Sequence, residues 1–234
     1  MPEAPEFTIL MPCLNEEESI AICIEKVQRY IKKSGIHAEI LIADNGSTDN
    51  SVNIASSYQA NVVFVAQRGY GAAIRGGIPY AKGKFIITGD TDDAHDLENL
   101  DLFVEKLREG YNLVVGNRFL GGIEEGAMPW LHRYLGTPVL SFIGRTLFGV
   151  KVGDFNCGLR GYTKELALKM NLKTNGMEFA SEVIINAALC KAKVVEVPTK
   201  VLPSKRSRPS YLHTWRDGWR NLSLMIRSFI KNKV

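Results

Sequence analysis

The sequence predicts an α/β protein in which a mainly parallel central sheet is covered by helices on both faces. Short apolar segments alternate along the chain with amphipathic segments of helical periodicity, and this alternation is typical of parallel strands joined by crossover helices. The apolar segments are short and continuous, as expected for strands that are buried on both sides of the sheet. Turn residues separate the two kinds of segment.

The first strand, turn and helix occupy the amino-terminal part of the chain. Phe7–Met11 is β-rich and is followed by Pro12, which ends the predicted strand. Asn15 can cap a helix whose first turn holds three consecutive glutamates, and Gly35 is the predicted stop. Between these two positions four apolar residues recur at helical spacing, namely Ile20, Ile24, Val27 and Ile31.

The same unit then recurs. Apolar segments predict further strands at residues 39–43, 62–65, 85–88 and 113–115. The segments that connect them are residues 51–58, 68–77 and 97–110. In open parallel sheets ligands bind beyond the carboxyl ends of the strands. That edge is predicted to hold Pro12–Glu16, Asp44, Arg68–Gly71, Asp90, Asp92 and Arg118.

The pattern changes after Arg118, where glycines mark a connection to a second apolar stretch, residues 128–149. This stretch is interrupted by Arg133 and Arg145 and is too short and too charged to span a membrane. It either packs in the core, which we favour, or lies on a membrane surface. Beyond it we predict a loop that leads into a strand, a helix and a last strand, at residues 154–162, 178–192 and 194–197.

Composition places the chain among ordinary globular proteins. It has 234 residues, of which 45% are hydrophobic and 23% are charged, enough for one domain with a sizeable core. The four cysteines form no CxxC pair and have no ligand-like spacing with the four histidines, so neither a zinc site nor a disulfide framework is predicted. A reducing, cytoplasmic setting is expected. Neither a leader peptide nor a membrane-spanning run is found, which predicts a soluble or peripheral protein.

Charge is distributed unevenly. The net charge is +4, yet the residues from Lys200 onward contain nine basic residues and one acidic residue and carry +8, so residues 1–199 carry −4. We therefore divide the chain into residues 1–200 and a basic segment, residues 201–234. The segment is predicted to end in an amphipathic helix with the apolar residues Trp215, Trp219, Leu222, Ile226 and Phe229. Tryptophans flanked by basic residues suit an interfacial helix, and packing on the same domain is the alternative.

The stretch Phe85–Asp96 carries four carboxylates within seven positions of a turn that follows an apolar strand. Side chains two residues apart in extended backbone point to the same side, so Asp90 and Asp92 can reach one hard cation, Mg²⁺ or Mn²⁺. Such a cation retains open positions for phosphate oxygens. The pair therefore predicts a site for a metal and a diphosphate, with a solvated acidic loop as the alternative.

The glycine-rich stretch that begins at Gly69 is not a dinucleotide fingerprint. The fingerprint requires Gly or Ala at its third position, where the helix and the strand must pack closely. That position is occupied by Ile74. A dehydrogenase is therefore disfavoured, although Gly71 lets backbone amides approach a ligand. A nucleic-acid binder is disfavoured as well, because the carboxylates at the sheet edge would repel that ligand.

Eight motifs, in this order, resemble glycosyltransferase family 2 with its GT-A fold: MPCLNEEESI, ADNGSTDNS, RGYGAAIRGG, GDTDDAH, VVGNRF, MPWLHRYLG, DFNCGLRGY and EFASEVI. The resemblance covers nearly the whole chain and is strongest for the polyprenyl-phosphate branch, that of the dolichol-phosphate mannose synthases. It implies that residues 1–200 are the GT-A domain. It also implies a donor site formed by Pro12, Leu14, Glu16, Asp44, Gly71, Asp90, Thr91, Asp92, Arg118 and Lys205.

The same resemblance assigns the reacting groups. Asp90 and Asp92 hold the metal, Arg118 and Arg133 face phosphate groups, and Thr137 lies near the acceptor. We expect Asp92, Arg118 and Arg133 to be the catalytic residues. The chain departs from the family after the second aspartate, where it reads Ala94, His95 and Asp96, although His95 itself matches the family. A third side-chain ligand is missing from its usual place, so Asp93 or water is expected to complete the metal's shell.

The implied reaction is metal-dependent, inverting transfer of a hexose from GDP-mannose or UDP-glucose to a dolichyl or undecaprenyl phosphate at the cytoplasmic face of a membrane. The metal would stabilise the departing diphosphate. Because a lipid phosphate is already ionised, it needs cations to hold it rather than a base. Arginine is suited to this role, since guanidinium forks match phosphate geometry. The candidate cations are Arg118, Arg133, Arg160, Lys205 and Arg206. Arg160 has an alternative role as a partner of Asp154.

Two other functions stay open. Transfer to a sugar hydroxyl requires a carboxylate base, for which Glu178 or Glu182 is available, although each can instead be structural, as a helix amino-terminal charge or the partner of an arginine. The chain can also be a catalytically silent nucleotide-binding partner of a membrane protein. The expected partners are a nucleotide sugar, a polyprenyl phosphate and a membrane surface, with no nucleic acid.

Overall fold

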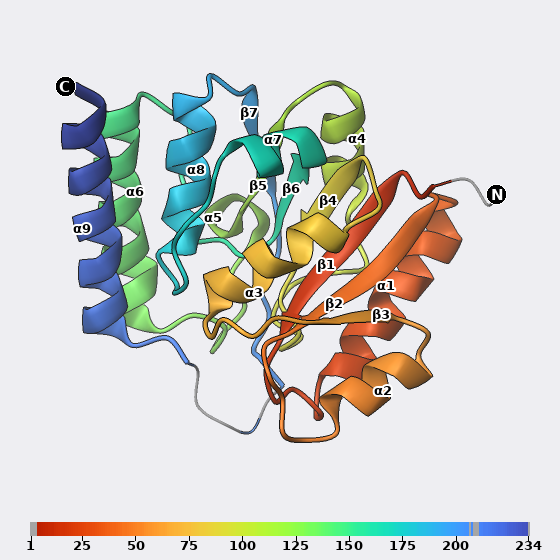
Figure 1. The fold of residues 1–234 in the computed structure, drawn as a ribbon. Helices are drawn as coiled ribbons and strands as arrows, with labels where there is room; N and C mark the ends of the chain where they lie inside the picture. The colour runs from red at the N-terminus through yellow and green to blue at the C-terminus, as the bar shows by residue number, and fades with distance from the viewer. Residues whose placement is uncertain (1–3, 206, 208–210, 234) are drawn as a thin grey trace.

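A computed structural model describes residues 4–205, 207 and 211–233 of the chain. Its centre is a seven-stranded sheet with the strand order β3-β2-β1-β4-β6-β5-β7 (Figure 1). The strands are β1 (Phe7–Cys13), β2 (Ala38–Asp44), β3 (Asn61–Phe64), β4 (Phe85–Thr88), β5 (Leu113–Asn117), β6 (Arg160–Thr163) and β7 (Val194–Pro198). Within this sheet β6 runs antiparallel to β4 and β5, and the other neighbouring pairs are parallel.

Helices cover both faces of the sheet, as predicted (Figure 1). The helical elements are α1 (Ile20–Ser34), α2 (Ser51–Ser57), α3 (Tyr70–Gly77), η1 (Ile78–Tyr80), α4 (Asp101–Arg108), α5 (Arg118–Gly121), η2 (His132–Gly136), α6 (Thr137–Phe148), α7 (Lys164–Lys169), α8 (Phe179–Leu189) and α9 (Thr214–Lys233). Successive side chains of β1 point to opposite faces of the sheet and so belong to two parts of the core. Phe7, Ile9 and Met11 pack with apolar residues of α1, α2 and α4, whereas Leu10 packs with residues of α3, α7, α8 and α9.

The position of the crevice follows from the strand order. The chain passes from β1 to β2 and β3 on one side and then returns to β4 on the other side of β1. Adjacent strands whose connections leave in opposite directions open a crevice beyond their carboxyl ends. Cys13 ends β1 and Thr88 ends β4, so the residues that follow these two positions flank the crevice.

The predicted first helix begins later than expected. Asn15 has a left-handed backbone with φ of 55°, and the N–H groups of Glu16 and Glu17 donate to Ser51 Oγ (2.8 Å) and Asp49 Oδ2 (3.1 Å) rather than forming the start of a helix. Helix α1 therefore begins at Ile20. The glutamate-rich stretch instead joins the end of β1 to the turn after β2.

The second apolar stretch packs only in part. Helix α6 buries a narrow face of small residues, Thr137, Ser141 and Gly144, and Phe155 fills the space beside Gly144. Large side chains of the same stretch point outward, including Trp130, which is 70% exposed. Core packing thus accounts for one face only. Helices α6 and α9 lie side by side at one edge of the molecule (Figure 1), and no described helix has the length and apolar character needed to cross a bilayer.

Candidate active site

One pocket of about 870 Å³ opens at the crevice and extends to the first turn of α9. It collects predicted site residues from four separate parts of the sequence. These lining residues are Pro12, Leu14, Glu16, Asp90, Thr91, Asp92, Arg118 and Thr137. Thr91 ties two of the walls together, because its Oγ1 donates to the Pro12 carbonyl (2.8 Å) and its own carbonyl accepts from Ser19 Oγ (2.7 Å).

Asp90 and Asp92 both face this pocket from the turn after β4. Asp92 Oδ1 accepts the N–H of Ala94 at 3.1 Å, and Asp90 Oδ2 lies 3.0 Å from His95 Nε2. Among the described residues no third His, Cys, Asp or Glu joins them in a group that could hold a metal. Mg²⁺ commonly takes one or two carboxylates and completes its shell with water and substrate phosphates. This donor set therefore fits a divalent ion that arrives with a diphosphate.

Asp93 does not line the pocket, which favours water over Asp93 as the group expected to complete the metal's shell. Its φ of 61° is left-handed, and the buried carboxylate pairs with Lys26 Nζ at 2.5 Å and Lys205 Nζ at 2.9 Å. The two lysines compensate a charge that would otherwise be costly to bury. Lys205, which was expected at the donor site, is engaged with Asp93 here and lies outside the residues that line the pocket.

Residues 201–205 lie along the acidic turn and hold it in place. Leu202 N donates to the Ala94 carbonyl (2.9 Å), and Ser204 Oγ and Lys205 N donate to the Asp92 carbonyl (3.0 and 3.2 Å). This basic segment therefore forms part of the site's frame, more than a hundred residues from the turn in sequence. Arg206 and Arg208, two cations of the predicted basic loop, lie outside the described residues.

Arg118 occupies another wall of the pocket and is fixed by Asp154. Its Nε and Nη2 donate to the two carboxylate oxygens at 2.7 and 2.8 Å, and Asp154 is fully buried. Burial alone would raise the pKa of Asp154, but the Arg118 charge and backbone N–H donors outweigh burial and lower it. Burial likewise would lower the pKa of Arg118, and the Asp154 charge reverses this shift. Arg118 is therefore a rigid, permanently charged group facing the pocket.

Arg160 does not pair with Asp154, and the proposal that it holds a phosphate is also wrong. The side chain is 2% exposed, and its guanidinium donates to the main-chain carbonyls of Cys157, Phe155 and Ala180. Each of the three guanidinium nitrogens therefore has a carbonyl acceptor. Arg160 thus connects the loop before β6 to α8.

Three more predicted residues lie outside the set that lines the pocket. Asp44 accepts the N–H groups of Gly46 (3.0 Å) and Ser47 (3.1 Å) and so shapes the turn after β2. A Cβ at Gly71 would lie 2.6 Å from Phe179 Cβ, so this glycine allows α3 and α8 to pack closely. The Arg133 guanidinium lies 5.4 Å from the centre of the Tyr134 ring. A direct role of these residues in binding stays a prediction.

The carboxylates proposed as bases for a hydroxyl acceptor are both engaged. Glu178 pairs with Arg220 Nη2 at 2.8 Å, as the structural alternative predicted. Glu182 accepts the N–H groups of Lys173 (2.9 Å) and Thr174 (3.0 Å), which fixes the loop before α8. Neither residue lines the pocket. These contacts favour an acceptor that needs no base.

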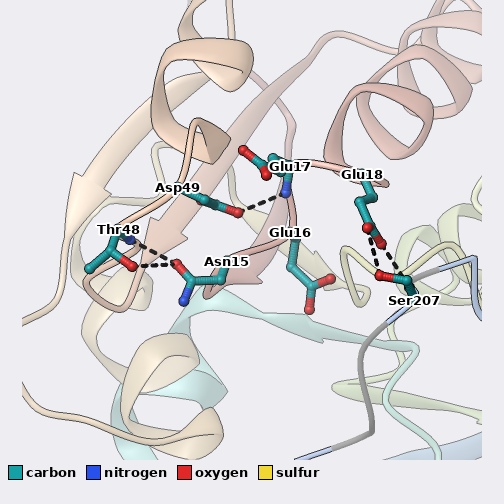
Figure 2. Close-up of a pocket in the computed structure, with 7 residues that line it drawn as sticks. All are labelled: Asn15, Glu16, Glu17, Glu18, Thr48, Asp49 and Ser207. Carbon is teal, nitrogen blue, oxygen red and sulfur yellow. Dashed lines mark hydrogen bonds between the residues drawn. The ribbon is translucent and has the colours of Figure 1, made fainter.

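A second, smaller pocket of about 250 Å³ lies next to the glutamate-rich stretch (Figure 2). Figure 2 shows Asn15 and Thr48 joined by hydrogen bonds at one side and Glu18 bonded to Ser207 at the other. Its acidic lining would repel a diphosphate. The larger pocket, which also holds Arg118, is therefore the candidate substrate site. The Glu18–Ser207 hydrogen bonds connect the glutamate-rich stretch to the carboxyl-terminal segment.

Sequence reasoning missed several residues that line the large pocket, namely His132, Asn156, Gly158 and Thr214. Most of them lie inside the eight motifs, beside residues that were selected. His132, for example, directly precedes Arg133, yet it is His132 that lines the pocket. A search of the motifs for every polar side chain would have found most of the set.

His132 is expected to make stability depend on pH. Its Nε2 lies 2.9 Å from Thr214 Oγ1, and burial, with a smaller effect of the Arg118 charge, lowers its pKa. Because the unfolded chain then binds this proton more readily, the free energy of unfolding should fall as the pH drops below about 6.5. His132→Gln should reduce that dependence. Urea unfolding of the wild type and His132→Gln at several pH values between neutral and acidic measures this dependence. The same change in the free energy of unfolding with pH in both proteins would contradict the prediction.

Comparison with known proteins agrees with this geometry. The model of a family described as Glycosyl transferase family 2 matches residues 8–170. The chain is 34% identical over 224 residues to the low-salt glycan biosynthesis hexosyltransferase Agl6 of Haloferax volcanii, covering 95% of this chain and 54% of Agl6. It thus spans about half of that relative's length. It is 28% identical over 193 residues to the dolichyl-phosphate hexose transferase of the same organism, covering 82% of this chain and 81% of that protein.

Solved structures share the fold. Glucosyl-3-phosphoglycerate synthase from Mycobacterium tuberculosis in complex with phosphoglyceric acid superposes with a TM-score of 0.74 and 19% identity over 96% of this chain and 80% of that chain. The complex of the same enzyme with Mn²⁺, UDP and glucosyl-3-phosphoglycerate superposes with a TM-score of 0.69 and 21% identity, over 97% of this chain and 77% of that chain. The expected GT-A-like arrangement is confirmed. Since the family match extends over more than half of its length, this chain belongs to glycosyl transferase family 2.

Proposed function

We propose that the protein is a metal-dependent, inverting hexosyltransferase that moves a sugar from a nucleotide-diphosphate donor, GDP-mannose or UDP-glucose, to a polyprenyl phosphate at a membrane surface. The observation that carries the proposal is a single pocket in which Asp90 and Asp92 face the site from one element and Arg118 from another. Carboxylates suit a metal-bound diphosphate, and a fixed guanidinium suits a second phosphate. The relative named dolichyl-phosphate hexose transferase supports this type of acceptor.

The roles of the side chains follow from these positions. Pro12 and Leu14, at the end of β1, form the wall against which the nucleotide lies. A divalent ion held by Asp90 and Asp92 would offset the charge of the departing nucleoside diphosphate. Arg118 orients the acceptor phosphate, which is already ionised and attacks without a base. Attack opposite the departing group inverts the configuration of the sugar carbon.

The outer surface beside the pocket supports a membrane acceptor. Trp215 and Trp219 lie one turn apart on α9 and are 81% and 69% exposed, while the pocket reaches Thr214 and Arg216 on the same turn. Exposed tryptophans beside arginines are typical of helices that lie in the headgroup region of anionic lipids. We propose that α9 rests on such a bilayer and brings the pocket to the lipid phosphate.

Removal of the two tryptophans should weaken binding to vesicles. In the double variant Trp215→Ala and Trp219→Ala, co-sedimentation with phosphatidylcholine vesicles that contain phosphatidylglycerol should fall at least about tenfold. Even partial burial of two indole rings, at roughly 25 cal/mol per Å², exceeds the roughly 1.4 kcal/mol that this factor requires. Phe64→Ala with Tyr80→Ala, two exposed aromatics elsewhere, is the matched control. Equal loss in both variants, or none, would reject the membrane role.

A transfer assay tests the function itself. The protein is incubated with Mn²⁺ and radiolabelled GDP-mannose or UDP-glucose, together with undecaprenyl phosphate, 3-phosphoglycerate or a methyl glycoside. Label extracted with the lipid supports the proposal. Label on phosphoglycerate would move the acceptor to the class named for the structural neighbour, and label on the glycoside would support a hydroxyl acceptor. Nucleotide binding without any transfer would indicate a catalytically silent partner.

A further inference from the structure

Two side chains that have no role in the proposed reaction lie against Asp90: His95 is buried and Tyr70 is partly buried. His95 Nε2 lies 3.0 Å from Asp90 Oδ2, and the His95 side chain is 4% exposed, against 28% for Asp90. The hydroxyl of Tyr70, the first residue of α3, lies beside the same carboxylate, because a Cβ built at Gly158 would be 3.1 Å from this hydroxyl and 2.6 Å from Asp90 Oδ2. Tyr70, His95 and Asp90 all line the large pocket.

The Tyr70 hydroxyl and His95 Nε2 are both placed to donate to the carboxylate. A tyrosine hydroxyl can only donate to an ionised carboxylate. For His95, Nδ1 is buried and makes no hydrogen bond within the described part of the chain. A buried N–H without a partner is rarer than an unpaired acceptor, so we assign the ring proton to Nε2, which donates to Asp90.

The bare backbone of Gly158 faces the same three groups. A Cβ at this position would lie 2.6 Å from Asp90 Oδ2, 3.0 Å from His95 Nε2 and 3.1 Å from the Tyr70 hydroxyl. The Gly158 backbone is not left-handed, so backbone conformation does not call for glycine here. The requirement is space, because any side chain would displace the carboxylate or its donors.

We propose that Tyr70 and His95 are positioning residues that fix the Asp90 carboxylate in the orientation needed to bind the divalent ion, with Gly158 leaving the space for this arrangement. The inference rests on the proposed metal-dependent function. Groups that donate hydrogen bonds to a metal ligand orient it and tune its basicity, and their loss typically weakens metal binding by about 10- to 100-fold.

The test measures Mn²⁺ binding rather than turnover. Free Mn²⁺ is followed by electron paramagnetic resonance while the wild type, Tyr70→Phe and Gly158→Ala are titrated in the presence of UDP or GDP. We expect the Kd for Mn²⁺ to rise about 10-fold or more in both variants. Tyr162→Phe is the control, because it removes the hydroxyl of another tyrosine that lies on β6 and outside the pocket lining. Its Kd should match that of the wild type.

A histidine series separates positioning from packing. His95→Gln keeps a donor near the position of Nε2 and should bind Mn²⁺ more tightly than His95→Leu. If the wild type binds Mn²⁺ but Tyr70→Phe and Gly158→Ala bind it within about twofold of the wild type while retaining its circular dichroism, the positioning role is rejected and the proposed function stands. If the wild type binds no Mn²⁺ with either nucleotide, the metal-dependent function and this inference both fail.

Discussion

Replacement of Asp92 by Asn is expected to lower the rate of sugar transfer by about 10³-fold, equivalent to roughly 4 kcal/mol of transition-state stabilisation. The substitution removes one of the two carboxylate charges at the mouth of the pocket, which we propose anchor the divalent ion. The fold should be retained, because Asn keeps an Oδ1 acceptor for the Ala94 N–H that Asp92 accepts at 3.1 Å. Initial rates at saturating donor, together with thermal unfolding, check both parts.

A neighbouring aspartate offers a matched control. Asp96 lies in the same acidic stretch, accepts a hydrogen bond from Asn99 Nδ2 at 2.8 Å and does not line the pocket. Asp96→Asn removes the same charge at nearly the same place and should leave the rate within about twofold, since a solvent-facing charge contributes little. Similar losses in both variants would mean that general electrostatics, rather than a bound ion, accounts for the effect.

Much of the architecture could be predicted because it depends on local patterns. Strands β1, which follows Pro5, and β4, which precedes the acidic turn, were recognised from their continuous apolar residues. Both lie within about two residues of the expected positions. The antiparallel direction of β6 was not foreseen. Its pairing of Gly161 with Ile87 joins segments far apart in the chain, and no local pattern records which way a returning strand runs.

For the candidate site, the sequence predicted some of the residues but not the contacts that hold them. Asp90, Asp92 and Arg118 were selected from the ends of strands, where parallel topology gathers ligand-binding residues, and the pocket contains all three. The contacts that fix them were not foreseen. Asp154 stands 36 positions from Arg118, and Lys205 is farther still from Asp93. Such pairs are set by tertiary packing, so the sequence indicated the candidate groups but not the residues that hold them in place.

Among the substitutions considered, the largest loss of stability is expected on replacing Asp154, the residue that holds Arg118 in place. Asp154→Asn retains the shape of the side chain but removes the charge that faces Arg118 Nε at 2.7 Å. Removal of one member of a buried pair costs about 3–5 kcal/mol, because the other charge is left uncompensated. Arg118 retains 14% exposure toward the pocket, and water can solvate part of its charge. We therefore expect a loss of about 3 kcal/mol in the free energy of unfolding.

An exposed pair provides the comparison that makes this prediction sharp. Glu6 accepts from Arg108 in a similar two-pronged contact, at 2.9 and 2.6 Å, but both side chains are at least one-third exposed. Glu6→Gln should cost no more than about 1 kcal/mol, because water screens the charges in both the folded and the unfolded chain. Urea denaturation of the two variants and the wild type measures both costs. A loss below about 1 kcal/mol for Asp154→Asn would show that the pocket solvates Arg118 without its partner, and Arg118 would then be free to reorient rather than held for the acceptor phosphate.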